Sequence, residues 1–308
     1  MLEDFKVVTP LIKLNSFENN TTYIKLEGSN LYGSAKDRAA MYVLSKLLEE
    51  GVINRDTEIV ESSSGNMGVA LAAVGAHLNL NITIMIDASI SSLNEFLIKA
   101  YGAKTIKITE ADENGSCLNK RLQAVKEYMA ERDNVYWVNQ YSNPLIIEAY
   151  KETLGKEIIQ QCPDVDYVFI AVSSGGTVAG ISQAVREYNK SIKVITVDVE
   201  GSKIFEPKTK KIKHFTGIGS SIRTDNFLRA SIDDKIIVGE QDSIQALFNM
   251  LRKEQLFLGG SSGCVVTGMD QYLRIHQITN KKIVIISHDR GDRYFANLYR
   301  KHLEFIDE

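Results

Sequence analysis

The chain has 308 residues, with 36 lysines and arginines against 39 aspartates and glutamates, so its formal net charge is −3. At about 150 residues per domain this length corresponds to roughly two domains, and 44% hydrophobic with 24% charged residues is typical of a folded globular protein. The near balance of charge favours neither a nucleic acid nor an anionic membrane as a partner.

The cysteines and the N-terminal segment indicate the compartment. The three cysteines are far apart and form no C-x-x-C pair, so a disulfide framework is not expected. The segment MLEDFKVVTP lacks the apolar stretch of a signal peptide, and no run reaches the roughly 18 apolar residues of a membrane span. We therefore expect a cytoplasmic protein that does not enter a membrane.

Short β-branched runs alternate with helix-length stretches along nearly the whole chain. We expect strands, in chain order, at 22–27, 57–62, 82–87, 104–109, 135–138, 166–172, 193–199, 235–239 and 282–287. We expect helices between them at 36–50, 66–79, 117–131, 145–161, 177–189, 241–254 and 263–278. Several strands are apolar on both faces, as when helices cover both sides of a sheet. The alternation predicts an α/β fold with largely parallel sheets.

Common phosphate, dinucleotide and metal signatures are absent from the sequence. There is no GxxxxGK[ST], no G-x-G-x-x-G after the first strand, no HExxH and no G-x-S-x-G. The histidines are scattered without the spacing of metal ligands, so no metal site is expected.

Three glycine-rich segments, at 62–68, 173–177 and 259–263, each adjoin the start of an expected helix. Glycine lets the backbone approach a ligand closely, and free N–H groups at a helix N-terminus attract anions. A single loop of this kind is more often only a turn. Three of them, two directly after expected strands, predict a ligand site at the strand ends.

Lys36 lies at an expected helix start, in the segment G-S-A-K-D-R at 33–38. The positive end of the helix dipole favours the neutral amine, which Schiff-base chemistry requires. Taken alone, such a lysine is more often a surface residue paired with a neighbour such as Asp37.

Together these segments resemble the fold-type II enzymes that use pyridoxal phosphate, in particular the cysteine synthase and cystathionine β-synthase family. The matching segments cover essentially the whole chain and are T-P-L at 9–11, G-S-A-K-D-R at 33–38, S-S-G-N-M-G at 63–68, S-G-G-T at 174–177 and G-I-G at 217–219. The resemblance implies a tryptophan synthase β-like fold of two lobes, each an open, mostly parallel sheet flanked by helices, assembled as a homodimer. The implied lobes are a smaller one at 38–141 and a larger, phosphate-binding one at 1–37 and 142–308, with the cofactor in the cleft between them.

The resemblance also implies which residues bind the cofactor. Lys36 would form the Schiff base and act as acid and base at the substrate Cα. Asn66 would bind the ring hydroxyl, and Ser261 would face the pyridine nitrogen, where a neutral hydroxyl favours β-chemistry over transamination. The phosphate would be held by backbone N–H groups and hydroxyls of Ser174, Gly175, Gly176 and Thr177.

The implied reaction is β-replacement on an O-activated L-serine through an aminoacrylate intermediate, which a second substrate attacks at Cβ. Met67 stands where the family usually has threonine, so one hydroxyl contact to the substrate carboxylate is missing. The implied substrate site, in which backbone N–H groups bind this carboxylate, comprises Ser63, Ser64, Gly65, Met67, Gln140 and Gly217.

Other segments are similar to N-(2-amino-2-carboxyethyl)-L-glutamate synthases of siderophore (staphyloferrin B type) biosynthesis, which join O-phospho-L-serine to L-glutamate. These segments are Y-W-V-N-Q-Y at 136–141, V-E-G-S-K-I-F at 199–205, G-I-G-S-S at 217–221 and D-R-G-D-R-Y at 289–294. Two anionic substrates require a cation, and Arg223, in the aperiodic stretch 200–234, is the candidate. An arginine in such a stretch is equally often a solvated surface residue with no role in binding. Asp225 could pair with Arg223 or activate a water, which would release hydrogen sulfide from cysteine.

Three alternatives stay open at this point: cysteine synthesis from O-acetyl- or O-phosphoserine and sulfide, a cysteine lyase, and a catalytically silent regulatory partner that binds the cofactor. The last is disfavoured because Lys36, the phosphate segment and Ser261 are all retained.

Overall fold

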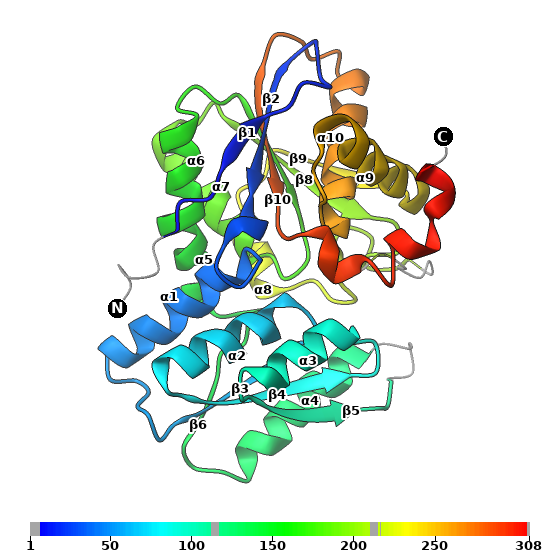
Figure 1. Cartoon of the computed structure of the whole chain (residues 1–308). Coiled ribbons are helices and arrows are strands. Elements are labelled where there is room, and N and C mark those ends of the chain that lie inside the picture. Colours follow the sequence, from blue (N-terminus) through cyan, green and yellow to red (C-terminus); the bar gives the residue numbers. More distant parts are fainter. Residues whose placement is uncertain (1–6, 112–116, 210–214, 216, 307–308) are drawn as a thin grey trace. The chain divides into compact units, whose positions relative to one another are not determined.

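The computed structural model of the protein describes residues 7–111, 117–209, 215 and 217–306. The chain forms two compact units (Figure 1). The smaller unit is Lys36–Leu145, and the larger unit joins Val7–Ala35 to the chain from Ile146 onward.

The smaller unit contains an all-parallel sheet of four strands in the order β5-β4-β3-β6. Its strands are β3 (Glu58–Ser62), β4 (Asn81–Asp87), β5 (Lys104–Ile108) and β6 (Val135–Trp137). Its helices are α1 (Lys36–Glu49), α2 (Asn66–Leu78), α3 (Ser92–Ala100) and α4 (Cys117–Ala130). Because the crossover from β5 to β6 returns past β3, right-handed connections place α4 on the opposite face from α2 and α3 (Figure 1). All residues of β4 after the first are therefore buried.

The larger unit contains a six-stranded sheet in the order β1-β2-β10-β7-β8-β9, parallel except for β1. Its strands are β1 (Leu11–Lys13), β2 (Thr21–Leu26), β7 (Tyr167–Ala171), β8 (Lys193–Val199), β9 (Asp234–Val238) and β10 (Lys282–Ser287). Its helices are α5 (Pro144–Tyr150), the π-helix η3 (Lys151–Gly155), α6 (Lys156–Gln161), α7 (Gly176–Tyr188), α8 (Asp225–Leu228), α9 (Glu240–Glu254) and α10 (Gly260–Ile275). Short 3-10 turns occur at η2 (Glu27–Ser29), η4 (Gly291–Tyr294), η5 (Tyr299–Lys301) and η6 (Leu303–Ile306).

The predicted parallel α/β architecture is confirmed, and every expected strand is present to within one residue at each end. Besides the short 3-10 turns, three elements were not expected: β1, α3 and the four-residue helix α8. The strand β1 has only three residues, none fully buried, so it carries no burial pattern. The helix α3 was missed because it is short. Its start is nevertheless marked in the sequence by Ser91, whose hydroxyl caps the helix by accepting the backbone N–H of Asn94. The expected helix 145–161 is interrupted by the π-helical turn η3.

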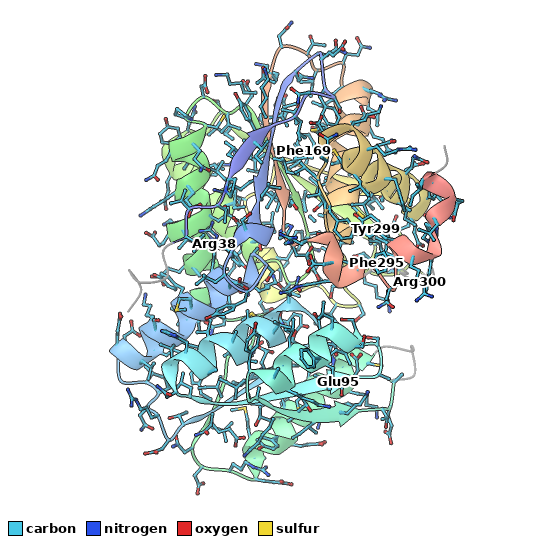
Figure 2. All side chains as sticks on the ribbon, viewed as in Figure 1. Arg38, Glu95, Phe169, Phe295, Tyr299 and Arg300 are labelled. Atoms are coloured by element: carbon cyan, nitrogen blue, oxygen red, sulfur yellow. The ribbon has the colours of Figure 1, made fainter. Side chains whose placement is uncertain are left out.

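Aromatic packing fixes the C-terminal segment against the larger sheet. Phe169 on β7 is fully buried and meets the ring of Tyr272 edge-on at 5.7 Å (Figure 2). The ring of Tyr299 lies 4.6 Å from that of Phe257, and its hydroxyl donates to the carbonyl of Leu258 at 2.6 Å. This contact positions the chain just before α10.

A buried lysine anchors the T-P-L segment. The Lys25 ammonium, fully buried, donates to the Thr9 carbonyl at 2.7 Å and to Glu157 Oε2 at 2.8 Å. The Thr9 hydroxyl donates to Glu27 Oε1 at 2.6 Å. The segment therefore has a structural role, tying the start of the larger unit to β2 and α6.

Within the described residues, none of the helices combines the length and hydrophobicity that a bilayer span needs. In the same residues, no three histidine, cysteine, aspartate or glutamate side chains are grouped as metal ligands would be.

Candidate active site

The loops at the carboxyl ends of the larger sheet converge, as expected for parallel strands. The backbone N–H of Gly219 donates to the Val172 carbonyl at 2.7 Å, and the hydroxyl of Ser173 donates to the Gly219 carbonyl at 2.9 Å. The G-I-G segment therefore lies against the end of β7, beside the phosphate segment. Gly217 has a φ of +83°, and a Cβ there would lie 2.8 Å from the hydroxyl of Tyr294.

The start of α7 has the properties of a phosphate site. Gly175 precedes the helix with a φ of +85°, and no side chain caps the helix. Among the described residues, the backbone N–H groups of Gly175, Gly176 and Thr177 have no acceptor. A left-handed residue followed by a helix start turns successive N–H groups toward one point, where an anion binds. The cofactor-phosphate residues predicted from sequence therefore fit a phosphate.

The helix α8 braces this loop. The hydroxyl of Thr224 donates to the Ser174 carbonyl at 2.9 Å and accepts the backbone N–H of Phe227 at 3.2 Å. Sequence reasoning missed Thr224, whose signal is a threonine directly before an acidic first turn. The exposed guanidinium of Arg223 lies 5.5 Å from the ring centre of Phe227. In the described part of the chain, Arg223 forms no ion pair with Asp225.

Ser261 is the second residue of α10 and is 1% exposed. Its hydroxyl has no hydrogen-bond partner among the described residues, so it is available to a ligand atom. At Gly259, the residue before the helix, a Cβ would lie 1.8 Å from Asp289 Oδ1, so only glycine permits this approach. The hydroxyl of Tyr294 donates to Asp289 Oδ2 at 2.6 Å.

Lys36 is the first residue of α1, which confirms the expected helix start. The residues before it are fixed in the larger unit: the backbone N–H of Ala35 donates to the His288 carbonyl at 2.8 Å, and Ser34 pairs with Asp289 in an isolated bridge. The backbone leading into Lys36 is thus held by the same segment that contacts Gly259, the residue before α10. The Lys36 side chain is half-buried.

The predicted substrate residues 63–67 follow β3 in the smaller unit. The hydroxyl of Ser63 accepts the N–H groups of Gly65 and Gly68 at 3.3 and 3.1 Å, and the hydroxyl of Ser64 accepts the N–H of Asp87 at 2.8 Å. Both hydroxyls therefore shape the loop, and among the described residues the backbone N–H groups of Ser64 and Met67 have no acceptor.

The loop ends in the first turn of α2 and contacts the segment after β6. Asn66 begins α2, and Met67 is 2% exposed, so its side chain belongs to the core and only its backbone can reach a ligand. The Gln140 amide donates to the Ser62 carbonyl at 3.0 Å, which joins the loop to the segment after β6. The structure thus gathers one group of predicted residues in each unit.

Sequence reasoning missed a buried carboxyl beside the substrate loop. Glu61, the residue before this loop, is fully buried, and its Oε2 accepts the backbone N–H of Gln140 at 3.0 Å. Burial raises its pKa to about 7, against the lowering effect of the N–H groups bonded to it. The signal was present as a glutamate directly after the apolar pair Ile59 and Val60, at the end of an expected buried strand.

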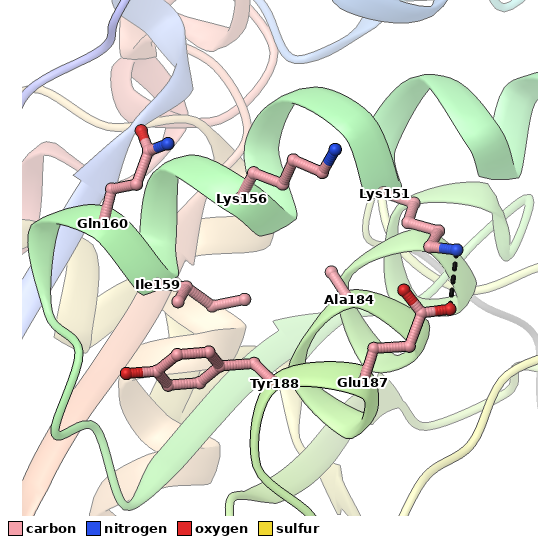
Figure 3. Close-up of a pocket in the computed structure, with 7 residues that line it drawn as sticks. All are labelled: Lys151, Lys156, Ile159, Gln160, Ala184, Glu187 and Tyr188. Carbon is pink, nitrogen blue, oxygen red and sulfur yellow. Dashed lines mark ion pairs between the residues drawn. The ribbon is translucent and has the colours of Figure 1, made fainter.

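One pocket lies apart from these residues (Figure 3). Its volume is about 310 Å³, and its lining includes Ile159 of α6 with Ala184 and Tyr188 of α7. At its rim Lys151 forms an ion pair with Glu187 at 2.6 Å. None of the predicted site residues lines it.

The larger unit is an α/β sheet with a strand-end loop, at the start of α7, that fits a phosphate. Lys36, at the start of α1, offers an amine of the kind that forms Schiff bases. Residues 2–289 match the model of the pyridoxal-phosphate-dependent enzyme family. The chain belongs to this family, and its cofactor is pyridoxal 5′-phosphate.

Solved structures with this fold cover almost the whole chain. The O-acetylserine-dependent cystathionine beta-synthase from Helicobacter pylori is 26% identical, with a TM-score of 0.88 over 97% of this chain and 98% of that chain. A hydrogen sulfide-producing enzyme from Fusobacterium nucleatum is 27% identical, with a TM-score of 0.87 over 96% of this chain and 99% of that one. Cysteine synthase from Entamoeba histolytica is 27% identical, with a TM-score of 0.87 over 97% of this chain and 90% of that one.

Proposed function

We propose that the protein replaces the β-substituent of an O-activated L-serine. The observation that carries this proposal is the combination of Lys36 at the start of α1 with the neutral hydroxyl of Ser261 at the start of α10. When bound, pyridoxal phosphate supplies an electron sink that acidifies the substrate Cα proton. A hydroxyl beside the pyridine nitrogen leaves that nitrogen unprotonated, which favours loss of a β-substituent over transamination.

Different residues of this chain would transfer the proton, bind the cofactor phosphate and bind the substrate. The Lys36 amine would take the proton from Cα and later return one to the same carbon. The open N–H groups of Gly175 and Gly176 would fix the cofactor phosphate. The N–H groups of the 63–67 loop, together with Gln140, would hold the substrate carboxylate.

Within this class we propose O-phospho-L-serine and L-glutamate as the substrates, giving N-(2-amino-2-carboxyethyl)-L-glutamate, a siderophore precursor. Supporting this choice, the Arg223 guanidinium is exposed and is not neutralised by Asp225 in the described residues. A free cation on the segment that braces the phosphate loop suits an anionic leaving group or a second carboxylate.

Sulfur chemistry is the second candidate, favoured by the names of the similar structures, which are an O-acetylserine-dependent enzyme, a cysteine synthase and a hydrogen sulfide-producing enzyme. The exposed carboxylate of Asp225, unpaired with Arg223 in the described part of the chain, could activate a water in a cysteine lyase. We also propose that the protein is cytoplasmic and forms a homodimer. Light scattering of the holoenzyme tests the homodimer.

The test is the visible spectrum of the holoenzyme during separate additions of O-phospho-L-serine, O-acetyl-L-serine and L-cysteine. We expect O-phospho-L-serine to change the cofactor band, L-glutamate to restore it, and mass spectrometry to detect the joined product. Restoration only by sulfide after O-acetyl-L-serine would identify a cysteine synthase instead. Sulfide release from L-cysteine would identify the lyase. No response to any of the three would overturn β-replacement and leave the regulatory role.

A further inference from the structure

The buried carboxylate of Glu61 lies where β3 ends and the substrate loop begins. Its Oε1 accepts the backbone N–H of Ser62 at 2.6 Å and the indole N–H of Trp137 at 3.4 Å, and its Oε2 accepts the backbone N–H of Gln140 at 3.0 Å. The Gln140 side chain closes the ring by donating to the Ser62 carbonyl at 3.0 Å. One carboxylate thus joins two segments that are 79 residues apart.

All three partners of this carboxylate are N–H groups, which can only donate. An ionised carboxylate satisfies them, because both of its oxygens accept. A protonated carboxyl carries no charge and one hydrogen, so the bonds that it accepts are weaker, and an amide presents an NH2 group in place of one oxygen, which breaks at least one of the three bonds.

Burial favours protonation of Glu61 at ordinary pH, whereas the cation near it opposes protonation. The titratable groups that interact with Glu61 among the described residues are Arg121 of α4 and Tyr141. Arg121 forms an ion pair with Asp87 at 2.9 Å, so one cation serves two carboxylates. Burial raises the pKa of Glu61 to about 7, whereas burial raises that of Tyr141 to about 12 and keeps the phenol neutral.

We propose that Glu61 is a positioning residue: its carboxylate holds Gln140 and the 62–67 loop in the arrangement that binds the substrate carboxylate, and protonation of Glu61 releases them. This inference rests on the proposed function, because it takes Gln140 and the loop as the amino-acid site. The ionised form binds substrate well, and the protonated form binds it poorly. Substrate affinity therefore falls as the pH drops through the titration of Glu61.

Trp137 provides a direct reporter, because it is the single tryptophan of the chain and its indole donates to Glu61. The first experiment titrates the tryptophan emission of the holoenzyme between pH 5 and 9. We expect one transition near pH 7 in the wild type and none in Glu61→Gln. An unchanged emission in the wild type, or an identical transition in Glu61→Gln, would overturn the proposal without any measurement of activity.

Glu58→Gln is the matched control, since Glu58 lies on the same strand and also accepts two hydrogen bonds. Its donors are the hydroxyls of Thr83 and Tyr128, at 2.6 and 2.9 Å. A hydroxyl can rotate and accept from an amide, which a backbone N–H cannot do. Glu58→Gln should therefore keep both the emission transition and the substrate affinity of the wild type.

The second experiment measures the dissociation constants of O-phospho-L-serine, O-acetyl-L-serine and L-cysteine against pH. For the substrate that binds, affinity in the wild type should be several-fold, and at most about tenfold, weaker at pH 6 than at pH 8, because the ionised fraction of a group with a pKa of about 7 falls about tenfold over this interval. Glu61→Gln should bind about tenfold more weakly at pH 8 and lose most of this pH dependence.

The possible outcomes distinguish the positioning role of Glu61 from the proposed β-replacement function. Equal substrate affinity in wild type and Glu61→Gln at pH 8 would overturn the positioning role and leave β-replacement standing. If the wild type bound none of the three amino acids, the proposed function would be overturned. A titration of the Trp137 emission in the same protein would still show that Glu61 ionises in this pH range. Because the wild-type titrations need no variant, instability of Glu61→Gln does not prevent the test.

Discussion

Replacing Gly175 by alanine tests how the phosphate loop is built. At φ +85° an alanine costs about 1–2 kcal/mol relative to glycine, because its Cβ crowds the backbone. The new Cβ would also lie 2.3 Å from the backbone nitrogen of Phe227, closer than the 3.0 Å that real Cβ contacts reach. The loop or α8 must therefore move by more than half an ångström, although Thr224 ties the two together.

We expect Gly175→Ala to weaken binding of pyridoxal phosphate by at least about tenfold, since hydrogen bonds from the loop N–H groups are lost or lengthened. The assay is fluorescence or absorbance titration of the apoprotein with the cofactor. Gly102→Ala is the matched control: Gly102 has a φ of +86°, but a Cβ there has nothing within 4 Å. It should lower the free energy of unfolding by about 1 kcal/mol and leave cofactor affinity unchanged. Equal cofactor affinities in Gly175→Ala and the wild type would refute the reasoning.

Four other predictions address catalysis and stability. Lys36→Ala should abolish turnover in the substrate assays, and an active variant would remove Lys36 from its role. Arg223→Ala should raise KM for O-phospho-L-serine or L-glutamate selectively, and unchanged kinetics with both would remove Arg223 from the site. Lys25→Met should lower the free energy of unfolding by about 3–5 kcal/mol in urea, because Glu157 would keep a buried charge without its 2.8 Å partner; a loss below about 1 kcal/mol would contradict this. Since the pKa of Glu61 is about 7 in the folded protein against 4.5 when exposed, the folded state binds its proton more tightly. Stability should fall by about 3 kcal/mol as pH rises from 4.5 to 7, and this contribution should vanish in Glu61→Gln.

The sequence predicted the fold because burial on both faces leaves continuous apolar runs, as in the strand N-I-T-I-M-I-D of β4. Glycine-rich loops predicted the starts of α2 and α7 to within one residue, and Lys36 was placed correctly on the first residue of α1. The helix α10 begins at Gly260, three residues before the expected start. The strand β1 was missed because its three residues gain their structure from pairing with β2, with Leu11 opposite Lys25.

Local pattern alone therefore determined the α/β class, the strand positions and the glycine-rich loops, since each depends on residues near one another in the chain. Only the tertiary structure decided that Thr224 braces Ser174 and that Glu61 bonds to Gln140. The second contact exists because β6 returns to pair with β3, with Val60 opposite Trp137. Which strands become neighbours depends on the packing of the whole unit. The carboxylate of Glu61 therefore gains its partners only when the sheet is assembled.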